Sequence, residues 1–276
     1  SKLKMKDKLN KEQIDFFKKN GYLVIKNFFP KKKITKLKSL SSNLFNSIYP
    51  TGISPDRIKW NKWMSLKIPR QLCNVWKSDK NFKKIITDKR IAKLASQLMC
   101  WKGIRLGQDS LIWVASKGGG ISMHQDDSYQ DWHSSSTTIT CSISLTDVNE
   151  NNSGLQFLKG SHLNKKSKPI KKFFFGRKYD YTIKKGNLKK FKKVVVEGKA
   201  GLISFHHGNL WHGSNVNLSS KDRISIVVHL IPMNSKFKSK INHPVYSHYK
   251  KFNTLEMDEN FFPILWSNKG RRSKFL

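Results

Sequence analysis

The stretch Ile121-Ser-Met-His-Gln-Asp-Asp-Ser-Tyr-Gln-Asp-Trp132 places a histidine and an aspartate two residues apart, directly after three consecutive glycines. Residues at positions i and i+2 of a strand share one face, so His124 and Asp126 are expected side by side. Such a pair can bind one cation, and a non-haem ferrous site needs the pair plus one more histidine. The stretch therefore predicts a metal site whose third ligand lies elsewhere in the chain.

Candidates for the third ligand gather in the segment 205–215, which contains His206, His207 and His212. A site with two histidines and one carboxylate has room for only one of these three. Arg223 follows at the expected start of a neighbouring strand. A co-substrate that binds the metal through two atoms could carry a second carboxylate farther from the metal. The guanidinium could bind that carboxylate through the fork geometry that arginine favours.

The spacing of apolar residues changes along the chain from helical to strand-like. Helical spacing predicts helices over 9–20, 31–47 and 88–99, while 50–80 is expected to form a loop-rich cover. Short β-branched or aromatic runs between turn residues predict strands at 22–25, 111–115, 137–145, 155–158, 193–196, 201–205 and 224–231. The order indicates a mainly β jelly roll with flanking helices, as a single domain over 1–276. The tail, 249–266, is expected to pack back on the barrel.

The formal net charge of +36 arises from 54 Lys and Arg against 18 Asp and Glu. Compositional drift in an AT-rich coding sequence explains such a lysine-rich chain, and an anionic substrate or carrier is a second explanation. Nucleic-acid binding is a third, and it is disfavoured because no nucleic-acid motif accompanies the charge. A basic segment at about 163–193 is read as a solvated insertion or as a lid for an anionic substrate.

Three widely spaced cysteines, Cys73, Cys100 and Cys141, argue against a disulfide framework and against a cysteine-based zinc site. No run of residues approaches the length of a membrane span, and the lysine-rich start lacks the apolar core of a signal peptide. We therefore expect a soluble, cytoplasmic protein. The oligomeric state does not follow from the sequence.

Taken together, the motifs resemble those of the phytanoyl-CoA dioxygenase family of iron(II)- and 2-oxoglutarate-dependent oxygenases over nearly the whole chain. The opening 9–25 is similar to the first helix and strand of that family, and 123–126 to its His-Gln-Asp motif. The matching segments that follow are 144–148, Gly160-Ser161-His162, 205–208, His212-Gly213-Ser214 and Arg223. The resemblance implies a double-stranded β-helix fold of the cupin-like type.

The resemblance also implies the roles of individual residues. His124, Asp126 and His212 would be the metal ligands and catalytic centre, and Arg223 would bind the 2-oxoglutarate C5 carboxylate. His206 and His207 would lie behind the ligands or at strand ends, whereas His229 is expected to play no part. Polar groups facing the co-substrate are expected at Gln108, Lys117 and Ser214.

The substrate would lie on the open side of the iron, near residues that follow the metal-binding stretch. The residues expected there are Trp113, Tyr129, Trp132 and His133. Aromatic rings beside acidic residues could bind a cation, whereas the basic segment at 163–193 favours an anion, so the charge of the small-molecule substrate stays open.

The family resemblance implies a dioxygenase that uses Fe(II), 2-oxoglutarate and O2 and releases succinate and CO2. Hydroxylation of a small metabolite or natural-product intermediate is favoured over halogenation, because related halogenases replace the carboxylate found here at Asp126 by a small residue. A desaturase or cyclase with the same oxidative chemistry, and a non-catalytic jelly-roll binding protein, are the alternatives.

Overall fold

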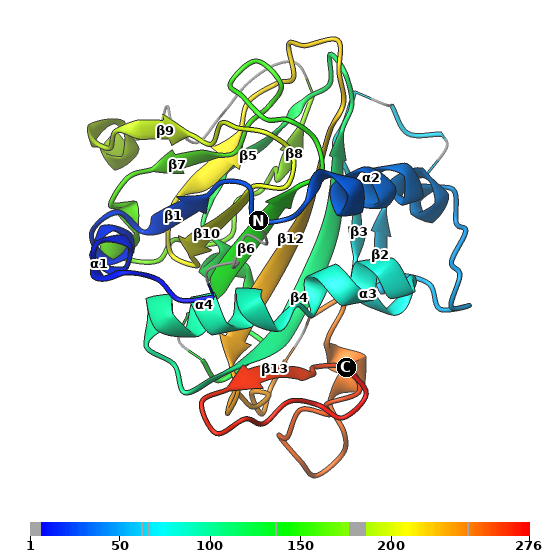
Figure 1. Cartoon of the computed structure of the whole chain (residues 1–276), viewed down its shortest axis with the longest axis vertical. Helices are drawn as coiled ribbons and strands as arrows, with labels where there is room; N and C mark the ends of the chain where they lie inside the picture. Colours follow the sequence, from blue (N-terminus) through cyan, green and yellow to red (C-terminus); the bar gives the residue numbers. More distant parts are fainter. Residues whose placement is uncertain (1–6, 62, 66, 136, 177–185, 242) are drawn as a thin grey trace, which may run out of the picture.

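The computed structural model describes residues 7–61, 63–65, 67–135, 137–176, 186–241 and 243–276. In these ranges the chain forms two antiparallel sheets with helices packed on the larger one (Figure 1). The jelly-roll architecture expected from the sequence is therefore confirmed. The predicted lid at about 163–193 lies partly outside the described residues, which omit 177–185.

The larger sheet has eight strands and provides the rigid platform of the molecule. Its order is β1-β10-β6-β12-β4-β3-β2, and β13 also pairs with β4. The bounds are β1 Tyr22–Ile25, β2 Arg57–Lys59, β3 Arg70–Cys73, β4 Gly103–Val114, β6 Ile139–Ser144, β10 Ile203–His207, β12 Arg223–Pro232 and β13 Ile264–Ser267.

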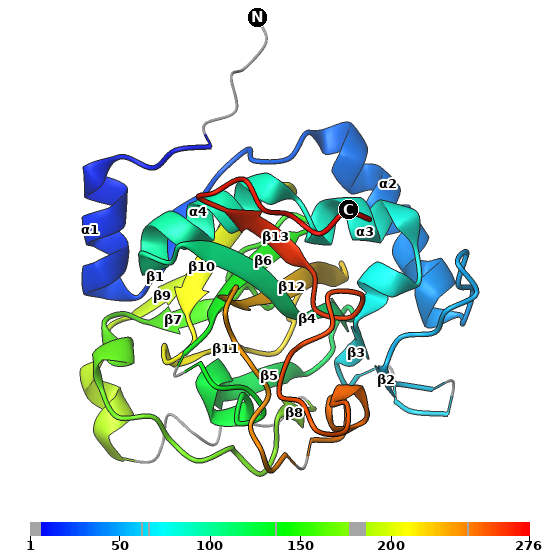
Figure 2. The ribbon, with the colours of Figure 1, turned by 90° about the horizontal axis from the view of Figure 1, so that it is seen from below.

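The smaller sheet has five strands in the order β8-β5-β11-β7-β9. The bounds are β5 Gly120–His124, β7 Gln156–Leu158, β8 Phe174–Phe175, β9 Lys193–Val195 and β11 His212–Ser214. Figure 2 shows β5, β8 and β11 on one side of the larger sheet and the helices on the other. Residues far apart in the chain thus meet between the two sheets.

The helices cover the outer face of the larger sheet and complete the main hydrophobic core. They are α1 Lys11–Asn20, α2 Lys31–Phe45, α3 Lys80–Ile86 and α4 Lys89–Met99. In α4 the buried residues Ile91, Leu94 and Leu98 recur at helical spacing and join Ile104 and Leu106 of β4 in this core. The outer face of the larger sheet thus carries the apolar side chains that pack on the helices, and its inner face is available for polar groups.

Helix ends follow the local sequence signals. Asn10 caps α1 by accepting a hydrogen bond from Gln13 N at 2.8 Å, and Gln13 returns one to Asn10 N at 3.0 Å. Gly21 ends the helix in the left-handed region, with φ of 81°. The predicted helix and strand at the start of the chain are therefore confirmed.

The segment 50–80 contains more regular structure than the sequence prediction of a loop-rich cover. It includes the short strands β2 and β3, which extend the larger sheet beyond β4, and the start of α3. These strands have only three and four residues and carry no clear alternation of polar and apolar residues.

The tail does pack back on the sheet, through β13. The longest helix described, α2, has 15 residues, and in the described ranges no helix is long and apolar enough to cross a membrane.

Candidate metal and co-substrate site

Two histidines face each other because β5 and β11 are paired closely in the smaller sheet. His212 is the direct register partner of His124, and their ring centroids are 4.2 Å apart. Gly213 permits this approach, since a Cβ there would lie 2.7 Å from Ile121 O. The pairing thus requires glycine beside the second histidine.

Both imidazoles are oriented by the backbone of their own strands. His124 Nδ1 lies 2.7 Å from Ser122 O, and His212 Nδ1 lies 2.8 Å from Leu210 O. A carbonyl can only accept, so each Nδ1 carries the proton and donates it. Each Nε2 is consequently left with a free lone pair, which is the form that binds a metal.

Asp126 completes the group, although it does not lie on the strand as its spacing from His124 suggested. β5 ends at His124, and Asp126 begins the short 3-10 helix Asp126–Tyr129. Its Oδ1 lies 3.4 Å from both His124 Nε2 and His212 Nε2. One ligand atom from each of the three side chains falls within 4.8 Å of the others, and all three residues are buried.

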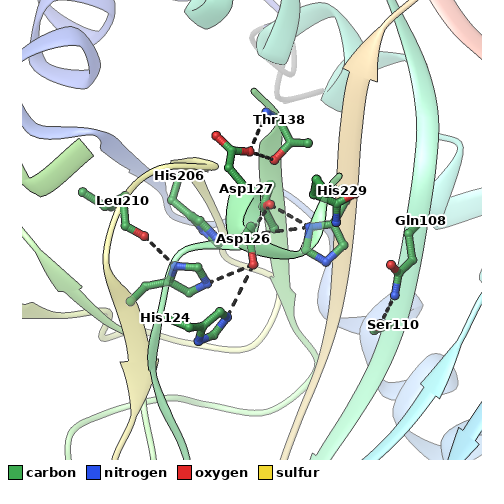
Figure 3. A network of polar contacts seen from close by, with 12 residues as sticks. Gln108, Ser110, His124, Asp126, Asp127, Thr138, His206, Leu210 and His229 are labelled. Atoms are coloured by element: carbon green, nitrogen blue, oxygen red, sulfur yellow. Dashed lines mark hydrogen bonds and ion pairs between the residues drawn. The ribbon is translucent and has the colours of Figure 1, made fainter. Parts of the chain in front are cut away.

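The second oxygen of Asp126 is held by residues of the larger sheet (Figure 3). Thr140 Oγ1 donates to Asp126 Oδ2 at 2.6 Å, and His206 Nε2 donates to the same oxygen at 3.0 Å. His229 Nδ1 in turn donates to Thr140 Oγ1 at 2.9 Å. Sequence reasoning assigned no role to His229, whose ring belongs to the hydrogen-bond network around the carboxylate.

The histidines around Asp126 also keep it ionised. Burial alone would raise the pKa of its carboxyl, but nearby His212 and His229 and the hydrogen bond from His206 hold that pKa well below its usual range. A carboxylate with one oxygen fixed from behind and the other beside two free imidazole nitrogens can bind a divalent cation. The donor set of two nitrogens and one oxygen suits ferrous iron.

Arg223 lies in the wall of a cavity that also contains the three candidate ligands. The cavity has a volume of about 60 Å³, and its apolar lining includes Ile121, Leu155 and Val227. The Arg223 side chain is buried and donates from Nε to Ser153 O at 3.0 Å and from its terminal nitrogens to Ser225 Oγ at 2.9 Å and Ser214 Oγ at 3.1 Å.

Arg223 remains a cation despite its burial, which lowers its pKa to about 10. A guanidinium has five N–H donors, and the described residues accept three hydrogen bonds from it. No carboxylate of those residues forms an ion pair with it. The remaining donors suit the carboxylate of a small anion that enters the same cavity as the metal.

The other residues expected around the co-substrate lie in different places. Ser214 contacts Arg223 directly. Gln108 is the register partner of His229 on β4, and its amide donates to Ser110 Oγ at 3.3 Å (Figure 3). Lys117 is exposed in a turn, where its ammonium donates to Leu218 O. The structure therefore brings Ser214 to Arg223 and does not bring Lys117 to the metal ligands.

Of the residues expected around the substrate, Tyr129 lies nearest to the metal ligands. Its ring centroid is 6.1 Å from that of His124, and both rings pack on Phe173. Trp113 is on β4, where its indole donates to Asp222 Oδ2 at 2.8 Å and its ring stacks on Arg70.

Trp132 and His133 are buried beside the C-terminal segment, and Trp132 also contributes to the lining of a cavity that includes Tyr129. Trp132 is 1% exposed and stacks on Tyr246, with ring centroids 4.0 Å apart, in a cluster formed with the C-terminal segment. His133 is fully buried and forms an isolated bridge to Phe237. The structure does not bring either side chain to the metal ligands, because the chain turns away after the 3-10 helix at Asp126–Tyr129.

The fold and the site together define a double-stranded β-helix protein with two histidines and one carboxylate between its sheets. The family model for phytanoyl-CoA dioxygenase matches residues 17–225, which is most of the chain. The chain belongs to the phytanoyl-CoA dioxygenase family.

Curated relatives match over most of the chain. A phytanoyl-CoA dioxygenase of Arabidopsis thaliana is 27% identical over 254 residues, covering 81% of this chain and 89% of the relative. An ectoine dioxygenase of Bordetella bronchiseptica is 22% identical over 263 residues, covering 88% of this chain and 80% of the relative.

Solved structures share the fold at lower identity. The 2-oxoglutarate-dependent carbocyclase SnoK from nogalamycin biosynthesis superposes with a TM-score of 0.73 and 17% identity, over 94% of this chain and 97% of SnoK. EctD from S. alaskensis, solved with 2-oxoglutarate and 5-hydroxyectoine, gives a TM-score of 0.70 and 19% identity, over 91% of this chain and 87% of EctD. Both proteins share the architecture of this chain.

Proposed function

We propose that the protein is an Fe(II)- and 2-oxoglutarate-dependent dioxygenase that hydroxylates a small molecule. His124, Asp126 and His212 would hold the iron. The observation that carries this proposal is the position of Asp126 Oδ1, which lies 3.4 Å from both imidazole Nε2 atoms. Neutral imidazoles with one carboxylate are the ligands typical of non-haem ferrous oxygenases.

Arg223 would bind the 2-oxoglutarate carboxylate that lies farther from the metal. It is the buried cation of the same cavity, and Ser214 and Ser225 fix the plane of its guanidinium. Ile121 and Leu155 give the co-substrate methylenes an apolar surface. The guanidinium would set the orientation of the co-substrate, because two parallel hydrogen bonds fix a carboxylate in its plane.

When bound, iron would supply the oxidising chemistry that converts 2-oxoglutarate and O2 to succinate and CO2 and places one oxygen atom on the substrate. The described residues act on this chemistry by positioning. Thr140 and His206 hold Asp126 so that one oxygen stays turned to the metal. Burial of the three ligands limits access of bulk water to the centre.

The named activities of the relatives support a small-molecule substrate, since the two curated ones are dioxygenases of phytanoyl-CoA and of ectoine. The carboxylate at Asp126 favours hydroxylation over halogenation, and desaturation or cyclisation are the alternatives that the turnover test below separates. The cytoplasmic location expected in the sequence analysis belongs to the same proposal.

The proposal is tested by iron and 2-oxoglutarate binding followed by turnover. Under anaerobic conditions, Fe(II) and 2-oxoglutarate should give a weak visible charge-transfer band, which His124→Ala and His212→Ala should abolish. His248→Ala is the matched control, because His248 is exposed and far from the ligands in sequence. Wild-type protein given O2 and cell extract should form succinate together with a metabolite that has gained one oxygen atom.

A band that survives in both ligand variants would refute the metal assignment. Bound iron without succinate formation across a broad substrate panel would indicate a binding protein instead. A product that has lost two hydrogen atoms, with no oxygen gained, would indicate a desaturase or cyclase.

A further inference from the structure

The edge of the larger sheet carries two cations on the face that lines the metal cavity. In the pairing of β2 with β3, Lys59 is opposite Gln71 and Arg57 is opposite Cys73. Directly opposed residues project from the same face of a sheet. Because Gln71 lines the cavity with the metal ligands, Lys59 and Arg57 belong to the inner face as well.

Lys59 is separated from a candidate metal ligand by a single aromatic ring. Its ammonium lies 5.3 Å from the ring centroids of both Phe173 and Phe174. The Phe173 ring in turn lies 4.5 Å from the ring of His124, measured between centroids. A charge on Lys59 is therefore close to the place where a substrate would react.

Arg57 opens onto a second, larger cavity beside the first. This cavity has a volume of about 1240 Å³ and is lined by Arg57, Tyr129, Trp132, Lys240 and Lys250 among others. Tyr129 packs against both Phe173 and His124, so the larger cavity adjoins the wall of the metal site. A substrate could lie in the larger cavity and present one end to the metal.

Neither cation of β2 has an acidic partner among the residues that the structure describes. Lys59 is half-buried, and burial together with the charge of Arg57 lowers its pKa. A half-buried ammonium beside the charge of Arg57 is unfavourable until an anion neutralises it.

Gln71 adds an independent sign of a ligand. Its side chain is 7% exposed and lines the metal cavity, and its Nε2 donates to Ser110 Oγ at 2.9 Å. The buried Oε1 accepts no hydrogen bond from the described residues. A buried acceptor without a donor is costly, so a ligand hydroxyl or N–H is expected there.

A cationic ligand finds less support, because the acids near the metal site are already engaged. Asp127 accepts hydrogen bonds from Thr137 Oγ1 at 2.6 Å and from Thr138 N at 2.9 Å. Asp131 forms an ion pair with Lys238. These contacts favour an anionic over a cationic ligand.

We propose that Arg57 and Lys59 bind an anionic group, a carboxylate or a phosphate, on the organic substrate, while Gln71 binds a hydroxyl or N–H nearer to the metal. This inference rests on the proposed function and narrows its substrate to anions. Arg57 and Lys59 determine specificity and take no part in the oxidation.

The test uses four probes with the same six-carbon chain: hexanoate, hexyl phosphate, hexanol and hexylammonium. Their binding to the full-length protein loaded with Fe(II) and 2-oxoglutarate is measured anaerobically by calorimetry. We expect at least one anion to bind about tenfold more tightly than hexanol and hexylammonium, which corresponds to about 1.4 kcal/mol. The better of the two anions identifies the group as carboxylate or phosphate.

Variants distinguish anion binding at a defined site from a general effect of the net charge of the protein on anion binding. Arg57→Gln and Lys59→Gln should each weaken anion binding about tenfold, while Lys59→Arg should retain it. Lys36→Gln is the matched control, because Lys36 is an exposed lysine on α2 and its loss changes the net charge equally. Thermal unfolding of each variant shows whether the fold is kept, and Arg57 is exposed enough to be replaced without loss of packing.

Equal binding of hexanol and the anions, or an equal loss in Lys36→Gln, would overturn the inference. Probe binding is measured without O2, so this test does not depend on turnover. Absence of the visible charge-transfer band would count against the proposed function, whereas a normal band without anion selectivity would count against this inference alone.

Discussion

The hydroxyl of Thr140 donates a 2.6 Å hydrogen bond to Oδ2 of Asp126, the carboxylate oxygen that lies away from the two candidate histidine ligands. His229 donates to the same hydroxyl at 2.9 Å, which leaves the hydroxyl proton directed at the carboxylate. These two hydrogen bonds in series therefore fix the Asp126 carboxylate. Its Oδ1 stays beside His124 and His212.

Replacing Thr140 by valine should weaken Fe(II) binding by about 10- to 100-fold, the usual effect of removing a group that orients a metal ligand. Valine keeps the shape of threonine, so the fold should be retained, and Thr140→Ser should restore binding. Iron affinity is measured anaerobically by competition with a chelator. Thr35→Val, at an exposed position of α2, serves as control. Unchanged affinity in Thr140→Val would show that the hydrogen bond does not position the ligand.

Replacing Arg223 by lysine should weaken 2-oxoglutarate binding by about 10- to 100-fold while leaving Fe(II) affinity unchanged. Lysine keeps the charge but loses the planar fork, and a hydrogen bond to a charged group contributes about 1.5–3 kcal/mol. The measurement is titration of the visible band with 2-oxoglutarate. Arg271→Lys, at an exposed position, should have no effect. An equal loss of iron binding would instead indicate that Arg223 supports the fold of the site.

Gly213→Ala should lower both the stability of the protein and its affinity for Fe(II). The added Cβ would lie 2.7 Å from Ile121 O, so β11 would have to move away from β5 and carry His212 from His124. Repacking of this kind costs about 1–3 kcal/mol. Gly176→Ala is the control, because nothing lies within 4 Å of a Cβ at that position. Equal stability and iron affinity in the two variants would contradict the close pairing of β5 and β11.

Trp132→Leu should reduce the free energy of unfolding by about 2–4 kcal/mol, because it removes much of a buried indole. Trp132 packs on Tyr246 and Phe262, away from the metal ligands, so binding of Fe(II) and 2-oxoglutarate should be unaffected. Urea unfolding and the visible band give the two measurements. Unchanged stability together with an altered band would indicate that Trp132 lies at the metal site, as its position in the sequence suggested.

The sequence predicted the parts of the site that local motifs carry. His124 and Asp126 are two residues apart, and His212 is followed by Gly-Ser, so a resemblance over short segments was enough to select them. The jelly roll was predictable for a similar reason, since short strands and turn residues alternate visibly along the second half of the chain.

The parts that escaped sequence reasoning depend on strand register. His206, Thr140 and His229 form one row across β10, β6 and β12, and nothing in the chain shows that these strands are neighbours. Their inward direction would have followed only from the pairing. The position of Trp132 also depends on the path of the chain, because the 3-10 helix after Asp126 turns it toward the C-terminal segment, where it packs on Tyr246.

Asp109 should make the stability of the protein fall as the pH rises. Its carboxyl is fully buried beneath the first residues of a 3-10 helix, Val75–Lys77, and accepts hydrogen bonds from Val75 N at 2.9 Å and Trp76 N at 3.4 Å. Burial outweighs these bonds and raises its pKa from 3.8 to about 8. The folded state therefore binds this proton more tightly than the unfolded state does.

Stability that depends on a proton held by the folded state is fully present below the unfolded pKa and is lost as the pH rises toward the folded pKa. Relative to Asp109→Asn, which cannot ionise, the wild-type protein should lose up to about 1.4 kcal/mol per pH unit between about pH 5 and 8. Above that range the difference should become constant. Urea unfolding of both proteins across these pH values gives the measurement. Parallel pH profiles would show that Asp109 is ionised throughout, and that the amides of Val75 and Trp76 outweigh the cost of burying its charge.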